Sequence, residues 1–300
     1  MTAELYIGTC GYSFPDWKGT VYPVNLRPSM YLVYYARTLG FAAVELDSSF
    51  YHMPAVPLVQ ALLQKTPQHF LFTVKAHRSM THDLWNNTRP ARPGMPPFPD
   101  LASGLKSIPT ISPSFVAFWE ALLPLADAGR LGSVVLQFPP WFRDTAENRA
   151  FLTAVPELLP RYPLSIEFRD SSWHTPEAVA FLKNEHLGYV AVDEPQIRNL
   201  LPLVPAVTSD TAYLRLHGRN PNWFGASREE RYDYLYSHEE LVQLLPSIKV
   251  MAAQATRMFI MTNNCHRGQA VANARDLQDM LLSTAGPQQL PVKTDVNLQE

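Results

Sequence analysis

The sequence predicts an α/β protein with a (β/α)8 TIM-type barrel as a single domain. Eight short apolar runs rich in β-branched residues follow one another along the chain, and helical patterns lie between most of them. Polar residues recur near the carboxyl end of many of these runs, which is where the active sites of such barrels are built. A doubly wound open sheet is the competing architecture, and the count of eight runs favours the barrel.

The expected strands are separated by the spacing that helices require. They are residues 5–9, 42–48, 70–76, 132–138, 164–168, 189–193, 212–217 and 258–263. The segment 112–129 opens on a serine and closes on a glycine, as helices often do. The segment 175–188 begins with Thr175 as N-cap and Pro176 at the first helical position, and a final helix follows Gly268.

Domain organisation follows from these elements and from the placement of proline. Residues 1–284 are expected to form the barrel as one domain, although chains of 300 residues often fold into about two domains. Residues 85–112 are expected to be a proline-rich loop after the third strand, because proline disfavours regular helices and central strands. Residues 285–300 lack periodicity and are expected to be a tail.

Composition narrows the class of partner. The net charge is −2 and the pI is near 6.5, which argues against a broad phosphate-tracking surface but allows a small cationic pocket. Nucleic acid would therefore be bound only through a localised site. The sequence indicates no obligate protein partner.

The sequence predicts a cytoplasmic location and contains none of the common nucleotide-cofactor motifs. No apolar run approaches the ~18 residues of a membrane span, and the start of the chain has no secretory signal pattern. Two cysteines do not make a disulfide framework. G-x-G-x-x-G, Walker A, G-x-S-x-G and CxxC motifs are absent from the sequence, so no nucleotide cofactor is indicated.

The alternation within the strands predicts a polar set on the barrel axis. Successive strand side chains point to opposite faces, and the outer face of a parallel barrel packs on helices. The polar residues that alternate with apolar ones should therefore point inward. They are Glu45, Asp47, Lys75, Gln137, Glu167, Arg169, Asp193, Arg215 and His217.

Two interpretations of this set compete. Three acids (Glu45, Glu167, Asp193) and three bases (Lys75, Arg169, Arg215) could neutralise one another as an internal ion-pair network. Apolar residues would fill the barrel more simply, however, so we favour a ligand site. Cation-lined pockets suit phosphate or carboxylate, which arginine binds bidentately.

A divalent metal is a further possibility that we do not favour. Glu167, Asp193 and His217 are of the types that could hold one, but no HxxxH or HExxH spacing supports a metal site. The interleaved cations would also oppose tight metal binding. Cofactors therefore stay unassigned.

Eight motifs in order resemble the DUF72 (YecE-like) family, across about residues 5–283. The motifs are IGTCGYSFPDWKGTVYP, VELDSSFYHMP, FTVKAHRSMTHD, VVLQFPPWF, IEFRDSSW, VAVD, YLRLHGR and TNNCHRGQAVANA. The resemblance implies a TIM barrel, in agreement with the pattern above, and it leaves the activity open because the family's function is not established. This chain departs from the family at Cys10, Tyr12 and Asp47, and its proline-rich connection is longer.

The resemblance and the strand pattern together give the candidate site. The candidate catalytic residues are Glu45, His82, Glu167, Asp193 and His217. The candidate substrate-binding residues are Tyr51, Lys75, Gln137, Arg169, Trp173, Arg215, Asn263 and Asn264. In this hypothesis a glutamate acts as general base and a histidine as acid, while the cations hold the anion and the amides orient oxygens. Trp173 could instead be a lid on the core.

We therefore expect an enzyme that acts on a small anionic substrate at the carboxyl end of the barrel. Phosphoester hydrolysis ranks first among reaction classes, because it depends on positioning and cationic stabilisation. A sugar isomerase or epimerase is the alternative enzyme, and a non-catalytic barrel that binds a metabolite or a partner is the third hypothesis.

Cys10 and Cys265 follow the first and eighth strands, which are neighbours in a closed barrel. The two thiols could therefore share a rim, and we expect them to be unbridged in a reducing compartment.

Overall fold

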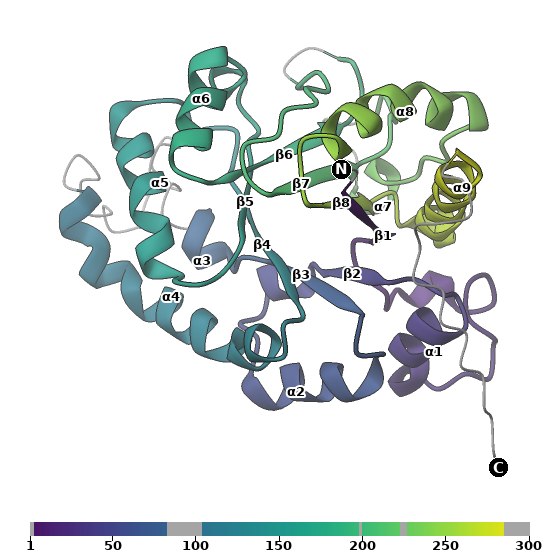
Figure 1. The fold of residues 1–300 in the computed structure, drawn as a ribbon. Coiled ribbons are helices and arrows are strands. Elements are labelled where there is room, and N and C mark those ends of the chain that lie inside the picture. Colours follow the sequence, from purple (N-terminus) through teal and green to yellow (C-terminus); the bar gives the residue numbers. More distant parts are fainter. Residues whose placement is uncertain (1–2, 83–103, 198–199, 223–226, 285–300) are drawn as a thin grey trace.

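The computed structural model describes residues 3–82, 104–197, 200–222 and 227–284. Eight parallel strands form a single barrel that helices surround (Figure 1). The strands are β1 (Glu4–Thr9), β2 (Ala43–Leu46), β3 (Leu71–Lys75), β4 (Leu131–Gln137), β5 (Leu164–Glu167), β6 (Gly188–Asp193), β7 (Thr211–Leu216) and β8 (Arg257–Thr262). All eight expected strands are present, and the predicted fold class is confirmed.

Each strand from β2 to β8 pairs in parallel with the next, and β8 pairs with β1. Between β1 and β2 the pairing is reduced to a single bridge between Cys10 and Glu45, where the Gly11 N–H donates to the Glu45 carbonyl at 2.8 Å. The barrel is therefore nearly closed, with its weakest seam between the first two strands.

A tyrosine hydroxyl completes this seam. The Tyr35 hydroxyl accepts from the Thr9 N–H at 2.9 Å and donates to the Ala43 carbonyl at 3.1 Å. The strands approach so closely that a Cβ on Gly8 would lie 2.1 Å from the Ala43 oxygen. Glycine is required here because any side chain would push the two strands apart.

Nine helices are described around the barrel. They are α1 (Tyr31–Arg37), α2 (Val56–Lys65), α3 (Arg78–Thr81), α4 (Gly104–Asp127), α5 (Ala146–Leu158), α6 (Pro176–Asn184), α7 (Arg228–Arg231), α8 (His238–Ala252) and α9 (Gln269–Thr284). Short 3₁₀ turns add η1 (Pro15–Trp17), η2 (Pro28–Met30), η3 (Ser48–Phe50), η6 (Ser171–Trp173) and η7 (His266–Gly268). Thr175 caps α6 as predicted, since its side chain accepts from the Ala178 N–H.

Helix α4 begins earlier than the sequence predicts. It starts at Gly104, so residues 104–112 are helical and not part of a loop. Prolines inside a helix cost hydrogen bonds, but this helix buries Phe115, Phe118, Leu122 and Leu125 completely. That burial favours the helix despite the prolines. Residues 85–103 of the expected loop and the expected tail 285–300 lie outside the described residues.

The connection from β6 to β7 has no helix among its described residues, 194–197 and 200–210. Pro195, Pro202 and Pro205 interrupt any helical hydrogen-bond pattern there. The segment packs Leu203 and Val207 against the outer core. In the described residues of this connection, β6 is therefore followed by β7 without the helix that a (β/α)8 barrel has between successive strands.

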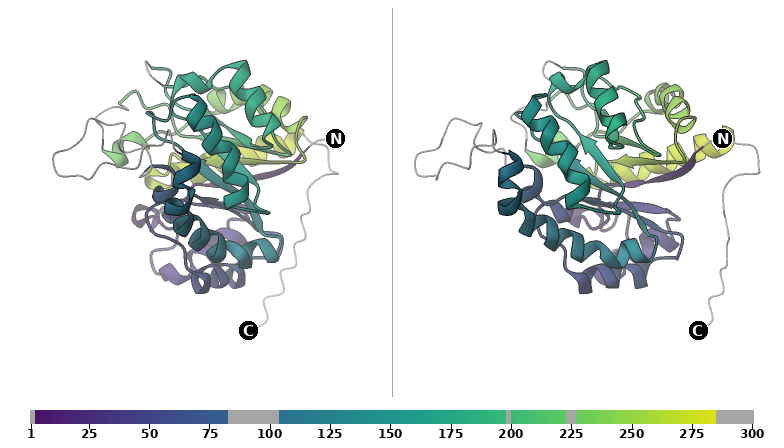
Figure 2. Two further views of the ribbon diagram at one scale, coloured as in Figure 1. Left: turned by 90° about the vertical axis from the view of Figure 1, so that its left-hand side faces the viewer. Right: turned by 60° about the vertical axis from the view of Figure 1, so that its left-hand side comes forward.

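Two apolar clusters fill the molecule. A large one lies between the strands and the helices that cover them, and the two views of Figure 2 show α4, α5 and α6 on the outside of the sheet. A smaller one fills the barrel interior and includes Ala43, Val135, Val190, Tyr213 and Met261. Membership of the inner cluster shows which strand positions face the axis.

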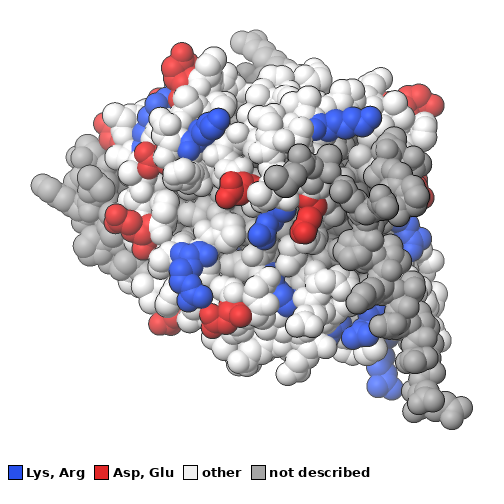
Figure 3. Space-filling view, viewed as in Figure 1, with Lys and Arg blue, Asp and Glu red and all other residues white. Residues whose placement is uncertain are grey.

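The surface carries no broad field of one sign on the side shown in Figure 3, where acidic and basic side chains are interspersed among uncharged ones. Among the described residues no helix is long and apolar enough to cross a bilayer.

Candidate functional site at the carboxyl end of the barrel

In most strands, the alternate residues that face the barrel axis become polar at the carboxyl end of the strand, as predicted. Glu45 follows Ala43 by two positions, Gln137 follows Val135 and Arg215 follows Tyr213, and each preceding residue belongs to the inner cluster. Lys75, Glu167, Arg169, His217 and Asn263 continue the same phase on their own strands. The strand ends therefore bring these groups together at one end of the barrel.

Arg215 lies at the centre of this set and is 1% exposed. One terminal nitrogen, Nη2, donates to Glu45 Oε1 at 2.7 Å, and the other, Nη1, pairs with Glu167 and reaches Gln137 Oε1 at 3.3 Å. Burial opposes the charged form, but Glu167 and Glu45 outweigh it and raise the pKa of Arg215. The guanidinium is thus fully charged and is held between carboxylates of β2 and β5.

Glu45 is buried and is bound on both oxygens. Its Oε2 accepts from the Tyr213 hydroxyl at 2.6 Å, and that hydroxyl also lies 2.8 Å from Thr73 Oγ1. Burial raises the pKa of Glu45 even though Arg215 acts to lower it. Glu45 therefore has an elevated pKa, but its side chain is fully buried and does not face solvent.

Glu167 and His217 are also completely buried. Burial acts to raise the pKa of Glu167, but Arg169 and Arg215 overcome it and hold that pKa well below the usual range. Burial, assisted by Arg169, lowers the pKa of His217 to about 3. His217 is neutral at physiological pH, and its Nδ1 lies 2.8 Å from the Asn263 amide nitrogen.

Arg169 is tied by two carboxylates, one of which the sequence analysis did not identify. Its Nη2 pairs with Glu167, and its Nη1 donates to Glu194 Oε2 at 2.8 Å. Glu194 is completely buried, and its other oxygen accepts from the Leu201 N–H at 2.8 Å. Burial raises the pKa of Glu194 against the opposing effect of Arg169.

A second charged pair lies at the end of β3. Lys75 Nζ is 3.1 Å from Asp47 Oδ1 and 4.5 Å from the centre of the Phe50 ring. His82 contacts the same ring edge-on, with 4.8 Å between ring centres. Tyr51, which is 48% exposed, stacks edge-on against Phe50 at the rim. His82 and Tyr51 therefore belong to the Lys75 side of the mouth.

Exposure separates the groups that a ligand can touch from those that support them. The side chains of Lys75, Arg169 and Asp47 are 10%, 12% and 14% exposed. Gln137 and Asn263 are half-buried. The mouth thus offers two cations, one carboxylate and two amides above a buried layer of fixed charges.

Asp193 does not share the axis, so its predicted inward orientation is wrong. Arg219 binds it bidentately, with Nε and Nη2 donating at 2.9 and 2.8 Å, and the Tyr236 hydroxyl donates at 2.7 Å. Val190 and Val192 belong to the inner cluster, so the inward phase of β6 leads to Glu194 and Asp193 faces the helices. The inward-facing and the outward-facing series of residues both end in an acid, Glu194 and Asp193 respectively, so the alternation pattern alone could not show which acid faces the axis.

Trp173 and Asn264 are also outside the mouth. Trp173 is fully buried against Phe168, with 4.2 Å between stacked rings, and donates to the Phe142 carbonyl at 2.8 Å, as expected of a lid on the core. Asn264 donates to the Tyr234 carbonyl and to Asn273, so it fixes the β7–α8 connection and does not orient a substrate. Neither residue can contact a ligand on the axis.

The residues named as a possible metal set are not gathered, because Asp193 lies on the opposite face of β6 from Glu167 and His217. Within the described ranges there is no group of three or more His, Cys, Asp or Glu side chains arranged to hold a metal ion.

The two cysteines, for which the sequence left a shared rim open, are neighbours. Cys265 Sγ donates to the Cys10 carbonyl at 3.2 Å, and both thiols are buried and unbridged. Burial raises the pKa of the Cys10 thiol well above its ordinary value, with Glu45 adding to the effect. Cys10 is therefore a buried thiol beside Arg215, in surroundings that favour its protonated form.

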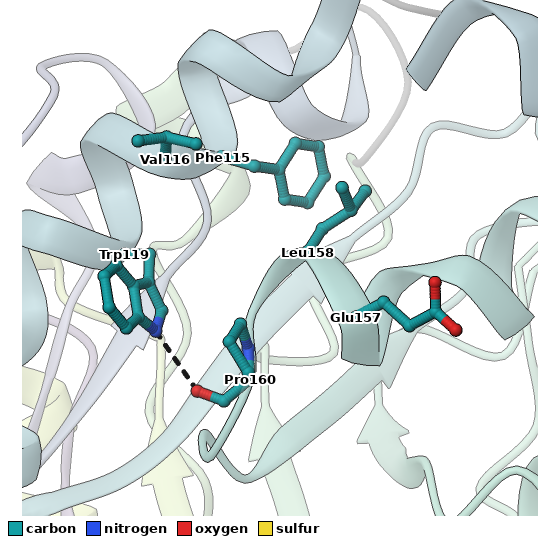
Figure 4. A pocket seen from close by; sticks show the side chains of 6 residues that line it. All are labelled: Phe115, Val116, Trp119, Glu157, Leu158 and Pro160. Carbon is teal, nitrogen blue, oxygen red and sulfur yellow. Dashed lines mark hydrogen bonds between the residues drawn. The ribbon is translucent and has the colours of Figure 1, made fainter. Parts of the chain in front are cut away.

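An apolar groove of about 220 Å³ lies away from the barrel mouth, between α4 and α5 (Figure 4). Phe115, Val116, Trp119, Leu158 and Pro160 line it, and the Trp119 indole donates to the Pro160 carbonyl at 3.2 Å. It contains Glu157 as its sole ionisable lining residue. The charged mouth is the better candidate for chemistry.

A comparison with known families assigns the chain. The model of the family described as "Protein of unknown function DUF72" matches residues 6–295. The chain belongs to the DUF72 family. A curated relative is the UPF0759 protein YunF of Bacillus subtilis (strain 168), which is 30% identical over 305 residues, with 95% of this chain and 99% of that protein covered.

Solved structures of DUF72 proteins agree with the barrel. The crystal structure of a DUF72 family protein from Thermotoga maritima MSB8 matches with a TM-score of 0.80 and 39% identity, covering 93% of this chain and 99% of that one. A DUF72 family protein from Enterococcus faecalis V583 matches with a TM-score of 0.76 and 26% identity, covering 95% and 99%. Membership in DUF72 fixes the fold and leaves the activity to be argued from the site.

Proposed function

We propose that this DUF72 protein is an enzyme that binds a small anionic substrate at the carboxyl end of its barrel. Lys75 and Arg169 would hold the anionic group, while Gln137 and Asn263 orient its neighbouring oxygens. The observation that carries the proposal is the partial exposure of these two cations above a fully buried layer of charges.

The buried layer supports a functional interpretation of the exposed groups. Glu167 and His217 contact Arg169 directly, and His217 also contacts Asn263. Arg215 in turn holds Glu167 in place. Burying so many charges costs free energy that an apolar core would avoid. A rigid support for groups that must meet a ligand in fixed positions gives a physical reason for that cost.

The charge balance also bears on the reaction class. Phosphoester hydrolysis, which ranks first from the sequence, loses support because Arg215 is buried and both of its terminal nitrogens are paired with carboxylates. The mouth combines cations, a carboxylate and amides, which suits proton transfer on a hydroxylated carbonyl compound. An isomerase-like or epimerase-like reaction is therefore the class that we propose.

Ligand-induced stabilisation tests the proposal. We expect the melting temperature of the protein to rise with millimolar carboxylate- or phosphate-bearing compounds and not with their uncharged analogues, because a bound ligand stabilises the folded state. Lys75→Met and Arg169→Met keep an unbranched apolar stem and remove the charge, so each should abolish the rise. Lys183→Met on α6, away from the strand ends, is the matched control.

Two outcomes would contradict the proposal. One is that the wild type responds equally to charged and uncharged compounds, which would mean that the mouth does not recognise anions. The other is that the Lys75 and Arg169 variants retain the full response, which would place the binding site elsewhere.

A further inference from the structure

On the basis of the anion-binding function proposed above, we propose that the site selects singly charged hydroxy acids over phosphate dianions, and that Glu194 determines this selectivity. Sugar acids and smaller polyhydroxylated carboxylates are the substrate class that fits. Nothing in the strand pattern or in the family description assigns a role to Glu194.

The charges at the mouth leave no positive surplus for a dianion. The cations are Lys75, Arg169 and Arg215. Four carboxylates lie against them: Asp47 on Lys75, Glu45 and Glu167 on Arg215, and Glu167 with Glu194 on Arg169. Phosphate sites need cationic charge that is free to compensate two negative charges, and here each cation already has a carboxylate partner.

The groups that face the ligand fit a carboxylate with hydroxyl neighbours. Arg169 keeps 12% of its side chain exposed although both terminal nitrogens have acidic partners, so it can share hydrogen bonds with one carboxylate. Asp47, Gln137 and Asn263 add acceptors and donors of the kind that hydroxyl groups require. A monoanion with hydroxyls uses all of these groups.

Glu194 is the carboxylate whose removal changes this balance most simply. It contacts Arg169 at 2.8 Å and pairs with no other charged group among the described residues, whereas Glu167 contacts Arg169, Arg215 and His217. Its second oxygen accepts a backbone N–H, which a glutamine oxygen can also accept. With that oxygen on the Leu201 N–H, the amide nitrogen of Glu194→Gln faces Arg169. The variant should therefore keep the backbone hydrogen bond, lose the one to Arg169 and free one unit of positive charge there.

The test compares glycerate, glycerol 3-phosphate and glycerol by NMR titration at pH 8, where the phosphate ester is a dianion. For the wild type we expect glycerate to bind about tenfold more tightly than glycerol 3-phosphate. Glu194→Gln should remove or reverse this preference, because an unpaired charge within a few ångströms of the anion favours the dianion more than the monoanion. Glu194→Asp should retain the wild-type preference.

Asp193→Asn is the matched control, because it removes the same charge from the adjacent residue on the outer face of β6, where Asp193 pairs with Arg219. The preference should be unchanged in that variant. Thermal unfolding of every variant checks that the fold is intact at the titration temperature.

The outcomes separate this inference from the proposed function. If glycerol 3-phosphate binds the wild type as tightly as glycerate, or if Glu194→Gln leaves the ratio unchanged, the selectivity inference is wrong while anion binding stands. If glycerate binds no better than glycerol, or if Arg169→Met binds glycerate normally, the proposed function itself fails.

Discussion

At the scale of single residues, the site shows how burial and neighbours divide similar groups into different roles. Glu45 and Glu167 occupy equivalent inward positions, yet burial raises the pKa of the first while two arginines lower that of the second. His217 is kept neutral by burial and by Arg169. It serves as a hydrogen-bond partner of Asn263 and is poorly suited to act as a general acid at neutral pH.

The depressed pKa of His217 predicts a stability that depends on pH. The folded-state pKa is about 3, whereas an unfolded histidine titrates near ~6.5, so only the unfolded state takes up this proton between those values. The free energy of unfolding should therefore fall as pH drops from ~6.5 towards 3, by at most about 1.4 kcal/mol per pH unit from this group. Urea unfolding of His217→Gln should show a shallower fall.

His69→Gln, at an exposed position, is the control and should follow the wild-type curve. Identical slopes for wild type and His217→Gln between pH 6.5 and 4 would show that His217 is not held neutral by the fold. Glu167 adds stability in the same direction but at lower pH, because its folded pKa lies well below its ordinary value.

At the scale of elements, the β1–β2 seam is the place where the barrel depends on a side chain. Elsewhere in the barrel, backbone pairs join successive strands, whereas here the Tyr35 hydroxyl of α1 stands between the Thr9 N–H and the Ala43 carbonyl. Helix α1 thereby takes part in closing the sheet and does more than cover it.

Removing that hydroxyl should weaken the closure measurably. Tyr35→Phe leaves a buried donor and a buried acceptor without their partner, which typically costs about 1–3 kcal/mol each for groups that stay unsatisfied. We expect a loss of at least ~1 kcal/mol in the free energy of unfolding, together with faster amide hydrogen exchange at Thr9. Tyr34→Phe, the same substitution on the neighbouring half-buried residue, should have a smaller effect, and equal losses would contradict this role for Tyr35.

At the scale of the whole molecule, one guanidinium links distant parts of the barrel. Arg215 on β7 forms ion pairs with Glu45 on β2 and with Glu167 on β5. Glu167 also pairs with Arg169, and Arg169 pairs with Glu194, which follows β6. The support of the mouth is therefore a network across the barrel. The loss of its central cation would leave the buried Glu45 without its arginine partner and the buried Glu167 with Arg169 alone.

We expect Arg215→Met to destabilise the protein by about 3–5 kcal/mol, as is usual when one partner of a buried ion pair is removed. The exposed pair between Arg161 and Asp127, 3.4 Å apart, provides the control, and Arg161→Met should cost less than ~1 kcal/mol. Chemical unfolding at neutral pH gives both values. A stable Arg215→Met protein would mean that the carboxylates become protonated at little cost.

Local pattern by itself determined the strands, the fold class and most of the axial set, because residue alternation and β-branched runs are properties of short segments. In this way Lys75, Glu167, Arg169 and Arg215 were correctly predicted to face the barrel axis, although Glu167 and Arg215 are fully buried there.

Only the tertiary structure decided which phase of β6 faces inward, since Asp193 and Glu194 both end apolar alternations. It also decided which charges meet across the barrel and which remain exposed, because these depend on distances between residues far apart in the chain. Apolar burial stabilises α4 despite its prolines and places Trp173 in the outer core. The amount of surface that a residue buries depends on neighbours from many segments, so no single segment of the sequence reveals it.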